Sequence, residues 1–273
     1  MNSDSAFYIG KTHHVCQDYA AHGSFLKEPF AIVSDGCSSS PDTDFGSRFL
    51  TKVCLDYFSS LHKVVEVNNL KQIISEADYY SRNLGLPAEA LDATLLFAKV
   101  KDQNYQIVCA GDGVIAKLKR DGAIEITQIE YDSGAPYYLN YQLLEKRNEG
   151  YKEKFGLLRR IKTYSIVKGI PTSIITKEDD DGNIFLEEGP AADYVALAVM
   201  SDGILSFMET VRTATSKTNV PVEPYKVLTE LLSFKSYTGV FVQRRFQRFR
   251  KDCEERGWFS MDDISIGAVH LGE

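Results

Sequence analysis

The chain has 273 residues, of which 44% are hydrophobic and 25% are charged, and its formal net charge is −7 at pH 7. A chain of this size can bury one large core, and we expect a single domain over residues 1–273. The acidic balance argues against a nucleic-acid-binding protein, because phosphate binding favours a basic surface. The longest apolar run, Tyr194–Met200, is far too short to cross a bilayer, and the first residues show no signal-peptide pattern. We therefore expect a cytoplasmic monomer that binds no membrane.

Five cysteines are scattered along the chain, with no CxxC pair and no Cys/His spacing that suits zinc. We expect reduced thiols that mostly fill the core.

The first half of the chain predicts strands and helices by apolar periodicity. Residues 30–34 form a short apolar run typical of a buried strand, and residues 44–61 and 70–84 have the three- and four-residue spacing of two helices. Four further runs joined by turn signals predict an antiparallel meander. These runs are 93–100, 106–110, 113–119 and 123–129.

The second half is less regular. Residues 137–189 begin with a polar, aromatic and poorly periodic stretch, in which we expect a flap or insert over the sheet, followed by a hairpin at 170–186. Asp121-Gly122 and Asp181-Gly182 have the sequence of ordinary hairpin turns. Beyond them we predict helices at 204–211, 225–232 and 239–256, and a closing strand at 264–271.

Four aspartates lie at the ends of predicted buried strands. Asp35, Asp112 and Asp202 follow apolar runs, and Asp262 precedes the last one. Carboxylates at strand ends converge in space, and such anions repel one another unless a cation neutralises them. Oxygen ligands favour Mg²⁺ or Mn²⁺ over Zn²⁺. The pattern therefore predicts a metal site.

Seven short motifs, taken in order, resemble those of the metal-dependent protein phosphatases of type 2C. They are CQDYA at 16–20, FAIVSDG at 30–36, DATLLFA at 92–98, CAGDG at 109–113, EYDSGA at 130–135, VMSDG at 199–203 and DDISIGAVHL at 262–271. The CQD form of the first motif is similar to a mainly bacterial branch of that family.

The resemblance implies an α+β fold, a four-layer α-β-β-α sandwich in which helices flank two antiparallel sheets. It also implies hydrolysis of phosphoserine and phosphothreonine on proteins by a hydroxide that bridges a binuclear Mg²⁺/Mn²⁺ centre, with room for a third, weaker ion. The implied partners are phosphorylated proteins, such as a serine/threonine kinase or its targets.

The resemblance also assigns roles to residues. Asp35 matches the aspartate that bridges both metals, and Gly36 matches the glycine whose carbonyl binds one of them. Asp202 and Asp262 match two further ligands of the first metal. Asp132 matches the acid that helps to hold a third metal.

Three acids match family positions with other roles. Asp18 matches an acid that orients metal-bound water, and we count it with Asp35 among the expected catalytic residues. Asp112 and Asp263 match motif acids whose role is more structural.

Three positions depart from the family pattern. Gln17 stands where most members have a glutamate ligand, so the second metal would lose one anionic ligand, although an amide oxygen still coordinates a hard cation. His13 stands where many members have an arginine that grips the substrate phosphate, and an imidazole makes no bidentate contact. Cys37 stands where some relatives have a histidine proposed as general acid, and a thiol is a poor substitute, so a metal-bound water or His14 would be the proton donor. His13 and His14 are equally well explained as a solvated pair at a strand end.

Two other classes of protein remain open from the sequence. One is a pseudophosphatase or phosphoprotein-binding regulatory module with weakened metal binding, which Gln17 and His13 favour. The other is a different two-metal hydrolase such as a nuclease, which the acidic balance disfavours. A local basic face is better explained as the solvated side of a helix whose phenylalanines pack inward, although it would also suit an acidic or phosphorylated partner. This face comprises Arg244, Arg245, Arg248, Arg250 and Lys251.

Overall fold

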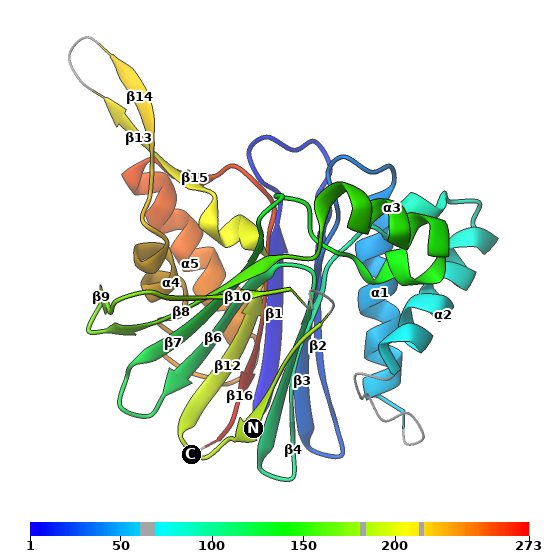
Figure 1. The fold of residues 1–273 in the computed structure, drawn as a ribbon. Coiled ribbons are helices and arrows are strands. Elements are labelled where there is room, and N and C mark those ends of the chain that lie inside the picture. The colour runs from blue at the N-terminus through cyan, green and yellow to red at the C-terminus, as the bar shows by residue number, and fades with distance from the viewer. Residues whose placement is uncertain (61–68, 181–183, 213–215, 273) are drawn as a thin grey trace.

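The computed structural model describes residues 1–60, 69–180, 184–212 and 216–272, and its centre consists of two stacked antiparallel sheets (Figure 1). The larger sheet has eight strands, of which seven follow the order β1-β16-β12-β6-β7-β8-β10, while β9 (Ile170–Pro171) pairs with β8. The strands in this order are β1 (Asn2–Tyr8), β16 (Ile264–His270), β12 (Tyr194–Met200), β6 (Gly113–Lys119), β7 (Ile124–Tyr131), β8 (Arg159–Val167) and β10 (Ile175–Asp179).

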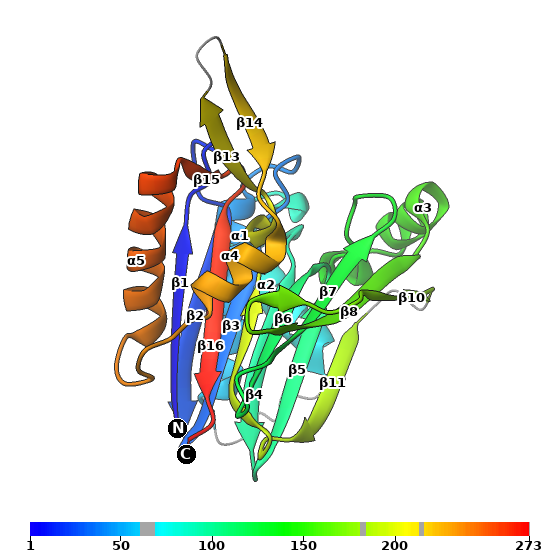
Figure 2. The ribbon, with the colours of Figure 1, turned by 90° about the vertical axis from the view of Figure 1, so that its left-hand side faces the viewer.

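The second sheet has five strands in the order β11-β5-β4-β3-β2. They are β11 (Phe185–Pro190), β5 (Asn104–Ala110), β4 (Leu95–Lys101), β3 (Glu28–Asp35) and β2 (Asp18–Phe25). A small third sheet joins β14 (Lys217–Pro221), β13 (Phe207–Arg212) and β15 (Trp258–Ser260), and it projects from one end of the molecule (Figure 2).

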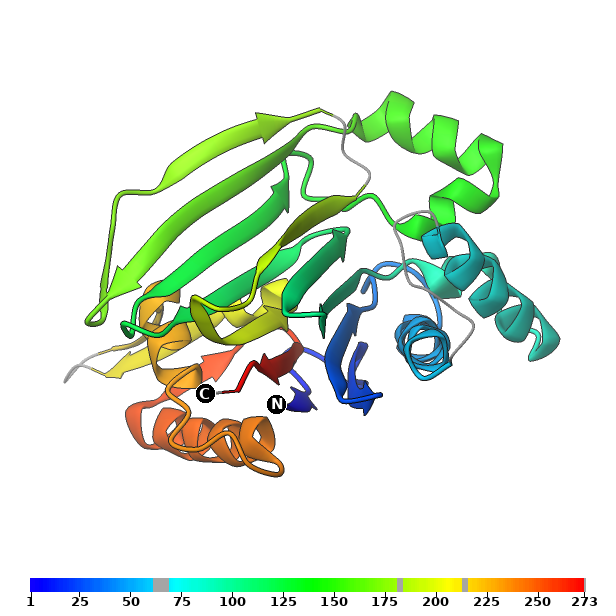
Figure 3. The same ribbon diagram turned by 90° about the horizontal axis from the view of Figure 1, so that it is seen from below.

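Helices cover both outer faces of the sandwich (Figure 3). Helices α1 (Thr43–Phe58) and α2 (Leu70–Asn83) pack on the five-stranded sheet, and α4 (Pro224–Leu231) and α5 (Phe241–Arg256) pack on the larger one. The remaining helix, α3 (Glu145–Phe155), lies beside the ends of the sheets. This arrangement confirms the predicted α-β-β-α sandwich.

The alternation of side chains along β3 shows why three apolar layers form. Ala31 and Val33 face the other sheet, whereas Phe30 and Ile32 face the helices, and all four are buried. A strand buried on both faces needs a continuous apolar run, which is what the sequence supplies. Each fully buried side chain of the size of isoleucine contributes roughly 2 kcal/mol by leaving water. The helices are thus held to the sheets mainly by burial of apolar surface.

Most predicted elements exist, with ends shifted by a few residues. The strand predicted at 30–34 is part of β3, and the helices predicted at 225–232 and 239–256 correspond to α4 and α5. Helix α1 begins at Thr43 and ends at Phe58, while the last residue predicted for it, residue 61, lies outside the described residues. The turn predicted at Asp181-Gly182 also lies outside them.

Three predictions of local structure were wrong. Residues 204–211 form no regular α-helix, because a 3-10 turn at Asp202–Leu205 leads into β13, which pairs with β14 and β15. Residues 170–186 form no hairpin, because β10 pairs in the large sheet and β11 in the other. The predicted meander is two hairpins in different sheets, β4-β5 and β6-β7. Short apolar runs do not distinguish these alternatives, since the pairing is decided by distant strands.

The expected flap is partly helical. Residues 137–158 contain a 3-10 turn at Leu139–Leu143 and helix α3, and β8 follows. Helix α3 buries only Tyr151, so its sequence has no apolar stripe from which a helix could be predicted. No helix in the described ranges is long and apolar enough to span a membrane.

A close backbone contact joins the 3-10 turn after β12 to the start of β16. A Cβ atom on Gly203 would lie 1.7 Å from the backbone oxygen of Asp263. Side chains essentially never approach a backbone atom so closely, so only glycine fits there.

We predict that Gly203→Ala destabilises the protein by about 3 kcal/mol, because the two backbone segments must separate. The matched control is Gly150→Ala in α3, where nothing lies within 4 Å of the added carbon. Denaturant unfolding of both variants measures the effect. A Gly203→Ala protein as stable as the Gly150→Ala control would contradict the prediction.

Candidate functional site

An acidic cavity of about 340 Å³ opens where strands of both sheets end. Asp35 at the end of β3, Asp112 between β5 and β6, Asp202 after β12 and Asp262 before β16 all line it. The chain crosses from one sheet to the other at Asp112, which brings that acid to the same edge as the others. The structure therefore brings together the four aspartates that the sequence placed at strand ends.

The backbone around Asp35 is fixed by the neighbouring strand. The Asp35 amide donates to Thr94 Oγ1 at 3.0 Å, and the Thr94 amide donates to the Asp35 carbonyl at 2.8 Å. Across the β2-β3 pair, Asp18 lies directly opposite Asp35. Like charges in such a pair are destabilising, so the fold holds two acids together against their repulsion.

Burial and mutual repulsion disfavour the charged forms of these acids. Burial, followed by the charges of Asp18 and Asp202, raises the pKa of Asp35 well above its usual range. Burial and the charge of Asp202 raise the pKa of Asp112, and burial with the charge of Asp262 raises that of Asp202. A bound cation would reverse this effect by favouring the carboxylates.

Asp18 is fully buried and lies outside the cavity lining, opposite Asp35. Its Oδ2 accepts a hydrogen bond from Ser201 Oγ at 2.6 Å, while no donor in the described part of the chain reaches its Oδ1. Burial raises the pKa of Asp18 to about 7. An unbonded buried carboxylate oxygen beside an acidic cavity fits a site that holds cations and ordered water.

The chemistry of this donor set fits a hard divalent cation, because the cavity offers several carboxylate oxygens and its one thiol, Cys37, lies beside serine hydroxyls. Within the described ranges, no three side chains of His, Cys, Asp or Glu converge as ligands of a single ion. The individual ligands therefore stay predictions.

His13 lies between two acids and outside the cavity lining. Its ring nitrogens are 3.3 Å from Asp262 Oδ1 and 3.0 Å from Asp263 Oδ2. Burial lowers the pKa of His13, but the hydrogen bond to Asp263 and the charges of Asp263, Asp262 and Asp18 outweigh it, so the net pKa is raised. The ring thus contacts a predicted metal ligand, and a contact with substrate phosphate stays a prediction.

Asp263 organises the N-terminal loop. Its buried carboxylate accepts hydrogen bonds from the amides of Gly10 and Gln17, both at 2.6 Å. The Gln17 side chain donates to Thr43 Oγ1 at 2.7 Å and does not line the cavity. Gln17 therefore lies beside the first turn of α1, and its role as a metal ligand stays a prediction.

Asp132 also lies outside the cavity lining, although Gly134, Ala135 and Pro136 are part of it. Its carboxylate is 2.9 Å from Arg160 Nη2 at the surface. A third metal would have to compete with this ion pair, and a role of Asp132 as a metal ligand stays a prediction.

The flap supplies an aromatic wall that the sequence did not reveal. Tyr138, Tyr141 and Phe155 line the same cavity as the acids. The flap is anchored at Asp92, a buried acid that accepts hydrogen bonds from Arg147, Asn140 and Ser40. Asp92 begins the motif DATLLFA, yet only the fold shows which partners it has.

The comparison with family models settles the family. A model described as protein phosphatase 2C matches residues 10–234, which is more than half of the chain. The chain belongs to the protein phosphatase 2C family. The motifs quoted from 16–20 to 199–203 lie inside this match, and the last one lies beyond it.

Solved protein phosphatases share the fold at low sequence identity. A bacterial serine phosphatase has a TM-score of 0.58 at 16% identity, with 100% of this chain and 98% of that chain covered. The serine/threonine phosphatase Stp1 of Staphylococcus aureus has a TM-score of 0.56 at 15% identity, with 99% and 95% covered. The Mycobacterium tuberculosis phosphatase PstP/Ppp has a TM-score of 0.55 at 13% identity, with 100% and 99% covered. A search of the curated proteins found no match.

We predict that Arg147→Met loosens the flap of this protein phosphatase 2C family member. The change removes a charged partner from buried Asp92, and breaking a buried pair typically costs about 3 kcal/mol. Hydrogen exchange of the α3 amides should become faster by at least about tenfold. Lys146→Met is the control, because Lys146 is the exposed neighbour on the same helix. Equal exchange rates in the two variants would show that Asp92 does not anchor the flap.

Proposed function

We propose that this protein is a metal-dependent serine/threonine protein phosphatase that uses Mg²⁺ or Mn²⁺. The observation that carries the proposal is the acidic cavity itself: Asp35, Asp112, Asp202 and Asp262 line one space in a chain of the protein phosphatase 2C family. Cys16-Gln17-Asp18 supports placement in the bacterial branch with this form of the first motif.

Asp35, Gly36, Asp202 and Asp262 would hold two divalent cations, with Gln17 beside the second and Asp132 near a third. Bound cations would supply a Lewis acid for the phosphate oxygens and would lower the pKa of a water molecule. Asp18, held by Ser201, keeps its Oδ1 in one direction, where it would accept a hydrogen bond from the attacking water.

Other residues of the chain would bind and orient the substrate. Ser38 and Ser39 line the cavity and are exposed, so their hydroxyls would donate hydrogen bonds to phosphate oxygens. Tyr138, Tyr141 and Phe155 would contact the residues that flank the phosphorylated side chain and exclude bulk water. A phosphorylated protein, such as a kinase or its target, fits this combination of polar floor and aromatic wall.

The alternative is a phosphoprotein-binding module without turnover. Two contacts favour it: the His13 ring contacts the Asp262 carboxylate, and the side-chain amide of Gln17 donates a hydrogen bond to Thr43. Both would weaken a metal site without removing the cavity, so the activity test below decides between the two functions.

We predict that Asp35→Asn, Asp202→Asn and Asp262→Asn each lower phosphatase activity on a phosphothreonine peptide by at least about a hundredfold. Chelation should abolish the activity of the unmodified protein, and Mn²⁺ should restore it. Melting in the absence of metal should stay the same or rise for Asp35→Asn, because the change removes one of several repelling anions. Asp193→Asn, an exposed site away from the cavity, is the control.

Full activity in any of the three variants would reject that residue as a ligand. Calorimetric Mn²⁺ binding without turnover by the unmodified protein would favour the binding module, and activity that survives chelation would reject the metal mechanism.

We predict that Gln17→Glu tightens Mn²⁺ binding by about threefold or more, because an anionic oxygen replaces a neutral one. Without metal the variant should be less stable, since the Gln17 amide donates to Thr43 and a carboxylate has no proton to donate. Calorimetry and melting measure both effects. Gln247→Glu makes the same charge change on the exposed side of α5. A Gln17→Glu protein with the binding curve of this control would place residue 17 outside the metal site.

A further inference from the structure

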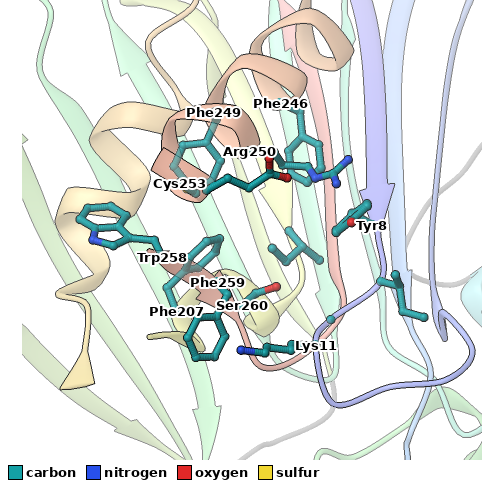
Figure 4. A pocket seen from close by; sticks show the side chains of 14 residues that line it. Tyr8, Lys11, Phe207, Phe246, Phe249, Arg250, Cys253, Trp258, Phe259 and Ser260 are labelled. Atoms are coloured by element: carbon teal, nitrogen blue, oxygen red, sulfur yellow. The ribbon is translucent and has the colours of Figure 1, made fainter. Parts of the chain in front are cut away.

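A second cavity, of about 270 Å³, lies between α5, the end of β1 and the small β13-β15 sheet (Figure 4). It shares no lining residue with the acidic cavity. Its walls are mainly aromatic, and Figure 4 shows their rings arranged around one space. The aromatic residues are Tyr8, Phe207, Phe246, Phe249, Trp258 and Phe259.

Two cationic side chains contact the aromatic rings of this cavity. Lys11 Nζ lies 3.6 Å from the centroid of the Phe259 ring, and Arg250 Cζ lies 3.3 Å from that of Tyr8. Neither cation forms an ion pair with a carboxylate elsewhere in the described chain, and Glu254 is the one acid of the lining. The cavity therefore carries more positive than negative charge.

Aromatic walls and unpaired cations together select a particular kind of ligand. A planar aromatic ring would be stabilised by stacked or edge-to-face contacts with the aromatic side chains. An anionic group on that ring would form charge-assisted hydrogen bonds with Lys11 and Arg250. The volume suits a ligand of about two fused rings, at the small end of the range for ligand cavities.

The cavity wall continues directly into the loop that contacts the acidic site. The Lys11 amide donates to the Ser260 carbonyl and the Thr12 amide to the Met261 carbonyl, both at 3.1 Å. A Cβ atom on Gly10 would lie 2.2 Å from the backbone carbon of Asp262, so these segments are in tight contact. These contacts join the wall at Lys11 and Ser260 to the segment that carries Asp262, and His13 lies two residues after Lys11 in the same loop.

We propose that this cavity is an effector site for small planar aromatic anions, and that ligand binding there changes the environment of Asp262. This site is separate from the phosphatase reaction, because its ligand is neither a metal ion nor a phosphorylated protein.

The test is a titration of the full-length, ¹⁵N-labelled chain with 1-naphthoate, followed by NMR. We expect saturable shifts of the backbone amides of Lys11 and Ser260, and shifts of His13 and Asp262 that follow the same binding curve. Neutral 1-naphthalenemethanol should bind at least about tenfold more weakly, because it lacks the charge.

Charge reversal provides the matched variants. Arg250→Glu and Lys11→Glu should each weaken 1-naphthoate binding by at least about tenfold. Lys251→Glu makes the same change one residue along α5, at an exposed residue outside the lining, and should bind like the unmodified protein. Lys11 is exposed, so Lys11→Glu should fold. It therefore provides the test if Arg250→Glu, at a half-buried residue, does not fold.

Three results would overturn the proposal. The first is that 1-naphthoate at millimolar concentration binds no better than the neutral alcohol, which includes the absence of any saturable shift. The second is equal weakening by all three charge reversals. The third is binding whose shifts stop at Lys11 and Ser260, which would reject the effector role. Since no step measures phosphatase activity, these outcomes are distinct from failure of the proposed function.

Discussion

The repulsion among carboxylates gathered at one end of the sandwich is the constraint on which the site depends. Asp18 and Asp35 oppose each other across two strands, and Asp202 and Asp262 are held together by the contact of Gly203 with the backbone of Asp263. Without a cation this arrangement costs stability, because burial raises the pKa values of Asp18, Asp35 and Asp202 and disfavours their charged forms. The apolar layers of the sandwich offset this cost. The fold therefore holds several carboxylates close together against their mutual repulsion.

Supporting polar contacts fix the acids in place. Asp263 draws the N-terminal loop toward β16 by accepting two amide hydrogen bonds, and Asp92 does the same for the flap through Arg147 and Asn140. These two buried acids face protein donors, whereas Asp35 and Asp202 face the cavity. A carboxylate that fixes the backbone and a carboxylate that lines the cavity thus differ in their surroundings.

The sequence predicted the parts of the structure that depend on local pattern. Apolar runs identified β3 and β16, helical spacing identified α1 and α5, and strand-end acids identified the edge at which the cavity lies. It did not predict which sheet each strand joins, because β10 and β11 choose distant partners. Nor did it predict the contacts of His13, Gln17 and Asp132, since these come from residues remote in sequence or from side-chain geometry. Family resemblance gave those residues roles that their surroundings here do not test.

The pairing of β1 with β16 has a consequence for biosynthesis. Asn2 lies opposite His270, so the hydrogen bonds between β1 and β16 can form only after the residues between these strands have been made. Long-range pairing of this kind makes folding slow, because a large loop must close before contacts compensate for it. Asp262 precedes β16 and is also made late. A nascent chain in which Asp262 and β16 have not yet been made therefore cannot form the complete acidic cavity.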